Sequence, residues 1–218
     1  MTAIARRLDL VTTDRRLLDH PFYKAWAAGT LSTDDLSFYS TQYWRQVEAF
    51  PGYLESVENR LPDGRAKEIV ASNLADETGQ NHAGLWRNFA SAVGAEELDG
   101  TTPEAETRTC VNTFQDAAAV RSLPYALGML YAYESQTPEV ADTKVAGLRA
   151  HYGIDGEGVT YFELHGKLDV HHAAELGAAL DEVATTESDR REAEAGARAG
   201  AAAVYTLLDG VARVRGIC

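Results

Sequence analysis

Apolar residues recur at intervals of three and four along most of the 218-residue chain, whereas strict alternation of apolar and polar positions is scarce. The first spacing places side chains on one face of an α-helix, while a half-buried strand needs a period of two. The pattern therefore predicts an all-α fold. A chain of this length supports one core, so we expect a single domain over residues 1–218.

Capping residues and prolines divide this pattern into helices. A first helix is expected to begin near Thr13, to carry the sequence HPFYKAW and to end at the turn of residues 29–30. Ser32, followed by two aspartates, is a favourable start for a second helix that runs to about Arg60. Pro51 lies inside that helix and predicts a kink.

The later helices have similar boundaries. A third helix is expected after the LPDG turn at 61–64, with an interruption at Gly79. Thr-Pro-Glu sequences at 102–104 and 137–139 indicate further starts, because proline is tolerated in a first helical turn. The remaining helical segments are expected over 122–135, 140–153, 161–172 and the alanine-rich 188–214.

Charge and composition narrow the possible functions. The net charge of -13, from 33 acidic and 20 basic residues, disfavours binding to nucleic acid or to an anionic membrane. No apolar run is long enough to cross a bilayer, and the N-terminus lacks a secretory pattern, so we expect a soluble, cytoplasmic protein. Cys110 and Cys218 are too few for a disulfide framework.

The sequence YFELHGKLDVHH, at 161–172, carries candidate metal ligands. His165, Asp169 and His172 are spaced i, i+4, i+7, which keeps them within roughly 60° of arc on one helix face. His171 falls off that face. Two imidazoles and a carboxylate suit iron, manganese or zinc. The alternative is a polar stripe that simply faces solvent.

Matching groups occur on other predicted helices. Glu77 and His82 would point about 140° apart on an unbroken helix, but a break near Gly79 could bring them to one centre. Glu134 ends a strongly apolar helix, where burial of an unpaired carboxylate would be costly unless a cation lies beside it. Alternatively, Glu134 is exposed at the helix C-terminus.

Three carboxylates and three histidines fit two divalent ions better than one, so we infer a dinuclear site. A ferritin-type site would need Glu-x-x-His motifs, and none of the glutamates has a histidine three residues later. The bundle is therefore of another kind.

These motifs resemble those of the haem-oxygenase-like di-iron oxidases and oxygenases. The resemblance covers nearly the whole chain, although Glu77 and His82 lie two residues closer together than in the family pattern. It implies a seven-helix bundle that forms a homodimer, as relatives do, and that binds two divalent ions, either two irons or one iron and one manganese. Dioxygen and an external reductant would react there. The ligands it implies are Glu77, His82, Glu134, His165, Asp169 and His172.

Within that family the chain resembles the members that make para-aminobenzoate for folate biosynthesis from their own side chains. The shared stretches include HPFYKAW and YAYESQTPEVADTKVAGL. The resemblance implies that Tyr23 supplies the ring and that Lys144 donates the amino nitrogen. A tyrosine ring with its β-carbon has the carbon skeleton of the product, and a buried lysine is partly deprotonated, as a nitrogen donor must be.

Other interpretations stay open. The same metal site could oxidise an external amino acid or fatty acid, or the bundle could be a metal-free binding protein similar to the thiaminase-like or pyrroloquinoline-quinone-forming relatives. Tyr23 could be an ordinary core residue and Lys144 a solvated one. Further tyrosines could relay electrons or fill the core; they are Tyr39, Tyr43, Tyr133 and Tyr161.

Overall fold

The computed structural model describes residues 2–95 and 97–218 and confirms the all-α prediction, since the described residues contain helices and turns but no strand. The first helices are α1 (Ala3–Val11), α2 (Pro21–Ala28), α3 (Thr33–Arg60), α4 (Arg65–Gly79) and α5 (His82–Ala92). They are followed by α6 (Ala105–Val120), α7 (Leu123–Glu134), α8 (Thr137–Gly147), α9 (Thr160–Val183) and α10 (Glu187–Arg215).

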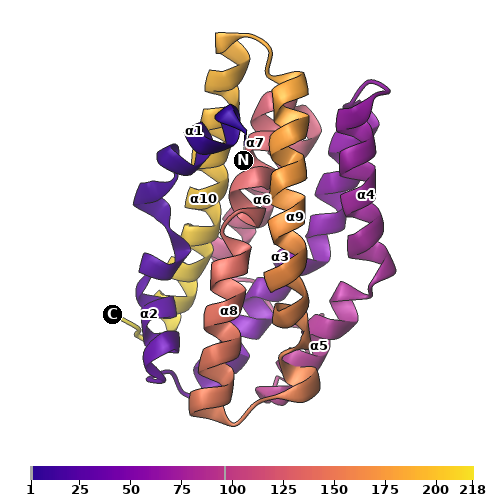
Figure 1. Ribbon diagram of the computed structural model, residues 1–218. Helices are drawn as coiled ribbons and strands as arrows, with labels where there is room; N and C mark the ends of the chain where they lie inside the picture. The colour runs from indigo at the N-terminus through magenta and orange to yellow at the C-terminus, as the bar shows by residue number, and fades with distance from the viewer. Residues whose placement is uncertain (1, 96) are drawn as a thin grey trace.

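Helix α9 runs along the bundle between α8 on one side and α4 on the other (Figure 1). Its inner side packs against α7, and α10 lies along α7 and α6. Helix α3 contacts α4, α5 and α6. The start of α5, the N-terminal half of α9 and the C-terminal ends of α4 and α7 carry buried polar residues. None of the described helices combines the length and hydropathy needed to span a membrane.

The predicted start of a helix at Ser32 is confirmed by α3. Ser32 accepts a hydrogen bond from the backbone N–H of Asp35, whose side chain in turn accepts from the backbone N–H of Ser32. This reciprocal pair satisfies two of the helix's free N–H groups. The helix then continues through Pro51 to Arg60.

The prediction of a helix that begins near Thr13 is wrong for the first part of that segment. Residues 13–19 form two short 3-10 turns, and α2 begins only at Pro21. Proline disfavours the helical conformation in the residue before it, and His20 is accordingly extended, with φ -67° and ψ 139°. The His20 side chain caps α2 by accepting from the N–H of Phe22. Helix α1 lies upstream, where none was predicted.

The described residues form more helices than the seven that the resemblance implies, because breaks in the chain divide longer helical segments. Asn81, with φ 53°, adopts the left-handed conformation that separates α4 from α5. Between α7 and α8, Pro138 has no N–H to bond the carbonyl of Glu134, which ends one helix as the next begins. Both breaks lie beside candidate site residues.

Small residues allow α10 to approach α7 closely. Gly196 of α10 lies against the backbone carbonyl of Tyr125, and Gly128 of α7 lies against the backbone of Ala193. A Cβ atom at either glycine would overlap those backbone atoms. The alanine-rich C-terminal segment therefore has a packing role, because it sets the distance between two helices.

Replacing Gly196 by Ala should destabilise the protein by about 2 kcal/mol, because overpacking at a backbone contact forces the two helices apart. Gly52→Ala is the matched control: Gly52 is an exposed glycine of α3 with nothing within 4 Å of its added Cβ. That change should be neutral or stabilise by roughly 0.5 kcal/mol. Urea unfolding of both variants measures the difference, and equal stabilities would contradict the close approach.

Candidate metal centre

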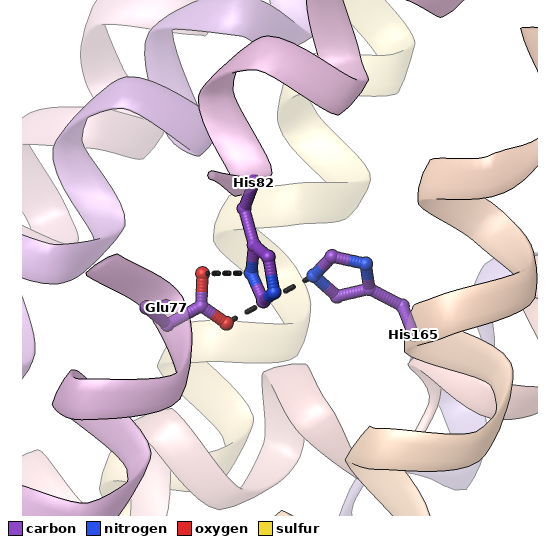
Figure 2. Close-up of side chains that lie close together, drawn as sticks. All are labelled: Glu77, His82 and His165. Carbon is purple, nitrogen blue, oxygen red and sulfur yellow. Dashed lines mark hydrogen bonds and ion pairs between the residues drawn. The ribbon is translucent and has the colours of Figure 1, made fainter. Parts of the chain in front are cut away.

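Glu77, His82 and His165 converge from three helices (Figure 2). Their ligand atoms all lie within 4.8 Å of one another. Glu77 Oε2 is 2.7 Å from His82 Nδ1, and Glu77 Oε1 is 3.9 Å from His165 Nε2. The break between α4 and α5 makes this possible, since an unbroken helix would point Glu77 and His82 apart. The predicted interruption is confirmed.

A second group lies beside the first. His172 Nδ1 is 3.6 Å from Asp169 Oδ1 and 4.0 Å from Glu134 Oε2. All three side chains are buried, with Glu134 only 1% exposed at the end of α7. The alternative interpretations, a solvent-facing stripe on α9 and an exposed Glu134, are therefore wrong.

His171 points the other way. Its side chain is 67% exposed and lies 3.3 Å from Glu175 one helical turn later. The helical spacing correctly separates it from His172, which is 1% exposed.

Several polar atoms in these groups are buried without a hydrogen-bond partner. They include His82 Nε2, Glu134 Oε2 and His172 Nδ1. His165 Nδ1 lies 2.7 Å from the carbonyl oxygen of Tyr161 and so donates its proton there, which leaves Nε2 with a free lone pair. Unpaired buried polar atoms are rare and costly. Coordination of a metal ion would satisfy them, so the donor set fits one.

A small cavity of about 10 Å³ connects the two groups. Its lining includes Glu77 and His165 from the first group and Glu134 and Asp169 from the second. The volume is about that needed by one water molecule. The two groups thus form one continuous polar site inside the bundle.

The charges at the site are strongly perturbed by burial. Burial lowers the pKa of His165, which favours the neutral imidazole that a metal requires. Burial, together with the nearby Asp169, raises the pKa of Glu134 well above its usual range. Burial also opposes the charge on His172, but its contacts with Asp169, Glu134 and Asp76 outweigh this and raise its pKa to about 9.

Tyr23 and Lys144 lie in a neighbouring part of the core. Lys144 Nζ donates to Tyr39 Oη at 2.7 Å, and Tyr39 Oη lies 3.3 Å from Tyr23 Oη. All three residues are buried. The interpretation of Lys144 as a solvated lysine is therefore wrong, and Tyr39 stands between the two predicted residues.

Aromatic rings surround the Lys144 amine. Its Nζ lies 4.7 Å from the ring centroid of Phe162 and 5.4 Å from that of Tyr23. Burial lowers the pKa of Lys144 to about 7, so much of the amine is neutral near neutral pH. A cavity of about 20 Å³ is lined by both Lys144 and His165, so this lysine lies next to the candidate metal ligands.

Three of the other tyrosines considered from the sequence line the small cavities beside the candidate ligands. Tyr133 and Tyr161 line both small cavities, and Tyr43 lines the one beside Lys144. The Tyr161 ring stacks on His165 at a centroid distance of 4.0 Å. These positions fit electron relays as well as core packing.

Sequence reasoning missed two residues of α4 that contact the second group. Asn73 Nδ2 donates to Glu134 Oε1 at 2.8 Å, and Asp76 Oδ2 lies 3.2 Å from His172 Nε2. A signal was available for Asn73, because it lies one helical turn before Glu77 and therefore on the same face.

Comparison with known proteins gives a consistent assignment. A family model described as an iron-containing redox enzyme matches residues 37–205. The chain is 35% identical to the 4-aminobenzoate synthase of Chlamydia muridarum, over 84% of this chain and 80% of that protein. It is 34% identical to the 4-aminobenzoate synthase of Nitrosomonas europaea, over 94% of this chain and 89% of that protein.

A solved structure has the same fold. The TenA homologue of Pseudomonas syringae pv. tomato superposes with a TM-score of 0.85 over 97% of this chain and 93% of that one. Its sequence identity is 19%, so the similarity concerns the fold.

Replacing Lys144 by Met should stabilise the protein at pH 7. The pKa of Lys144 is about 7 in the folded protein, against its ordinary value of 10.5 in the unfolded chain. Between these two pH values the Lys144 amine is therefore more fully protonated in the unfolded chain than in the folded protein. Stability should therefore rise with pH in this window, and the burial cost at pH 7 is on the order of 5 kcal/mol before the lost Tyr39 contact is subtracted.

Urea unfolding at several pH values measures this effect. The advantage of Lys144→Met over the wild type should shrink as the pH rises from about 7 towards about 10. Lys24→Met, at an exposed lysine of α2, is the control and should show a pH-independent difference. A constant advantage for Lys144→Met would contradict the lowered pKa.

Proposed function

Because the chain belongs to the haem-oxygenase-like family of iron-containing redox enzymes, we propose that it makes para-aminobenzoate by oxidative cleavage of its own Tyr23 side chain. Lys144 would supply the amino nitrogen. The observation that carries this proposal is the buried chain of Tyr23, Tyr39 and Lys144, which reaches a cavity shared with His165.

Six residues would hold the metals: Glu77, His82, Glu134, His165, Asp169 and His172. Their unpaired buried atoms and their two adjoining groups support a pair of ions, either two irons or one iron and one manganese. Such a pair, when bound, would supply the electrons and the charge stabilisation needed to activate dioxygen.

The carbon chemistry balances with one dioxygen molecule. Cleavage of the Tyr23 Cα–Cβ bond, with both oxygen atoms added to Cβ and one of its hydrogens moved to Cα, converts the side chain to 4-hydroxybenzoate. A glycyl residue remains at position 23. Four electrons leave the carbon and enter dioxygen, so this half of the reaction consumes no other oxidant.

Lys144 would act as a nucleophile through its neutral amine. Exchange of the para hydroxyl for the Lys144 nitrogen, with oxygen left on the lysine side chain, is balanced and redox-neutral overall. The apolar aromatic surroundings of Nζ favour the neutral amine over the ammonium ion, as the lowered pKa indicates.

The size of the inner cavities supports an internal substrate. The cavities beside the candidate ligands measure about 10 and 20 Å³, which is far below the several hundred Å³ of an ordinary ligand site. Dioxygen or water could occupy such spaces, whereas an amino acid or fatty acid would require the core to rearrange.

An external substrate is the second candidate function, and one observation favours it. A larger pocket of about 580 Å³ has Asp169 in its wall, together with residues of α1, α8 and α9. A small molecule bound there would adjoin the candidate ligands from outside.

Metal content tests the site directly. Loading the His165→Ala and Glu77→Ala variants with Fe²⁺ or Mn²⁺ under anaerobic conditions should leave at least one ion fewer per chain than in the wild type, as measured by plasma mass spectrometry. His171→Ala is the control and should bind as the wild type does, because its side chain faces solvent. Unchanged metal content in the first two variants would contradict the assignment.

Intact-mass analysis tests the source of the ring. After loading with iron or manganese and exposure to a reductant and oxygen, the protein should lose the mass of a tyrosine side chain, and peptide mapping should locate the loss at Tyr23. The Tyr23→Phe variant should form no para-aminobenzoate and keep its metals.

The Tyr39→Phe variant distinguishes the neighbouring Tyr39 from Tyr23 as the source of the ring. A loss that maps to Tyr39 in the wild type would reassign the ring source. Product formed by Tyr23→Phe with unchanged protein mass would favour an external substrate in the larger pocket.

A further inference from the structure

One turn of α4 contacts both groups of candidate ligands. Glu77 belongs to the first group, while Asn73 and Asp76 reach across to Glu134 and His172 of the second. Asn73 and Glu77 are four residues apart and share the buried face of the helix. The segment from Asn73 to Glu77 therefore links the two groups.

Asn73 fixes the orientation of Glu134. Its amide donates to Oε1 at 2.8 Å, and both side chains are at least 98% buried. The other oxygen, Oε2, has no partner and lies on the side of His172 Nδ1. Because asparagine is neutral, it orients the carboxylate without adding charge beside Asp169 and Glu134.

Asp76 fixes the orientation of His172. Its Oδ2 lies 3.2 Å from Nε2, so a proton on Nε2 is donated to this carboxylate. In the neutral imidazole that a metal ion requires, Nδ1 is then the unprotonated nitrogen, and it faces Asp169 and Glu134. A carboxylate that accepts from one ring nitrogen commonly fixes the tautomer of a metal-binding histidine.

We propose that Asn73 and Asp76 are positioning residues for the metal ion held by Glu134, Asp169 and His172, and that His172 binds this ion through Nδ1. The inference rests on the proposed metal site and extends it. His165, in contrast, is oriented by the backbone carbonyl of Tyr161 and binds through Nε2. The two metal positions therefore depend on different supporting groups.

Anaerobic titration with Mn²⁺ tests the positioning roles. Asp76→Ala and Asn73→Leu should each weaken one of the two binding steps by about 10- to 100-fold and leave the other unchanged. Asp76→Asn keeps an acceptor oxygen and should lie between Asp76→Ala and the wild type. Glu68→Gln, at an exposed position of α4, is the control and should bind as the wild type does.

The outcomes are distinguishable. A wild type that binds no Mn²⁺ would overturn the metal site itself. A wild type that binds two ions, with both steps unchanged in Asp76→Ala, would overturn only the positioning role. Equal weakening of both steps would also overturn it. Asp76 is partly exposed, so its variants keep the test valid if Asn73→Leu fails to fold.

Nitrogen NMR of the zinc-loaded, histidine-labelled protein tests the ligand atoms without any turnover. His172 should carry its proton on Nε2 and bind zinc through Nδ1, while His165 should show the reverse pattern. Coordination of His172 through Nε2 would overturn the assigned tautomer. In Asp76→Ala, the His172 proton signal should broaden or be lost as exchange with solvent increases.

Discussion

The burial of ionisable groups inside a helical bundle is the constraint on which this structure depends. Glu134 and Asp169 lie close together at low exposure, where a charged carboxylate loses its hydration and repels its neighbour. Protons and hydrogen bonds offset part of that cost in the chain alone, as the raised pKa of Glu134 and His172 indicates. Divalent cations would offset it more fully, and the candidate ligands already face one another.

Interruptions of the helices place these groups. The left-handed Asn81 turns the chain so that His82, at the start of α5, meets Glu77, near the end of α4. Pro138 ends α7 just after Glu134, which brings a carboxylate to the helix end beside α9. Close packing of α10 on α7, through glycines, completes the enclosure on the far side. The fold thus exposes few of its polar site atoms to water.

Lys144 is a further buried ionisable group next to this site, and its surroundings are of a different kind. Among the described residues, Lys144 makes no ion pair with a carboxylate; it donates to Tyr39 and is surrounded by aromatic rings. Such surroundings tolerate either the neutral amine or a cation over ring faces. The same burial that destabilises the ammonium ion provides the neutral nitrogen that the proposed chemistry needs, so a cost to stability and a chemical function have one cause.

The sequence by itself determined the helical class, most helix boundaries and the six candidate ligands, because these depend on local spacing, caps and residue chemistry. Helical periodicity also separated His172 from His171. It could not determine that residues 13–19 form 3-10 turns, since Pro21 and the side-chain cap of His20 act together there. Only the tertiary structure decided which tyrosine contacts Lys144 and that Asn73 and Asp76 contact the second group. Those contacts join residues far apart in the chain, and local sequence rules carry no information about such distances.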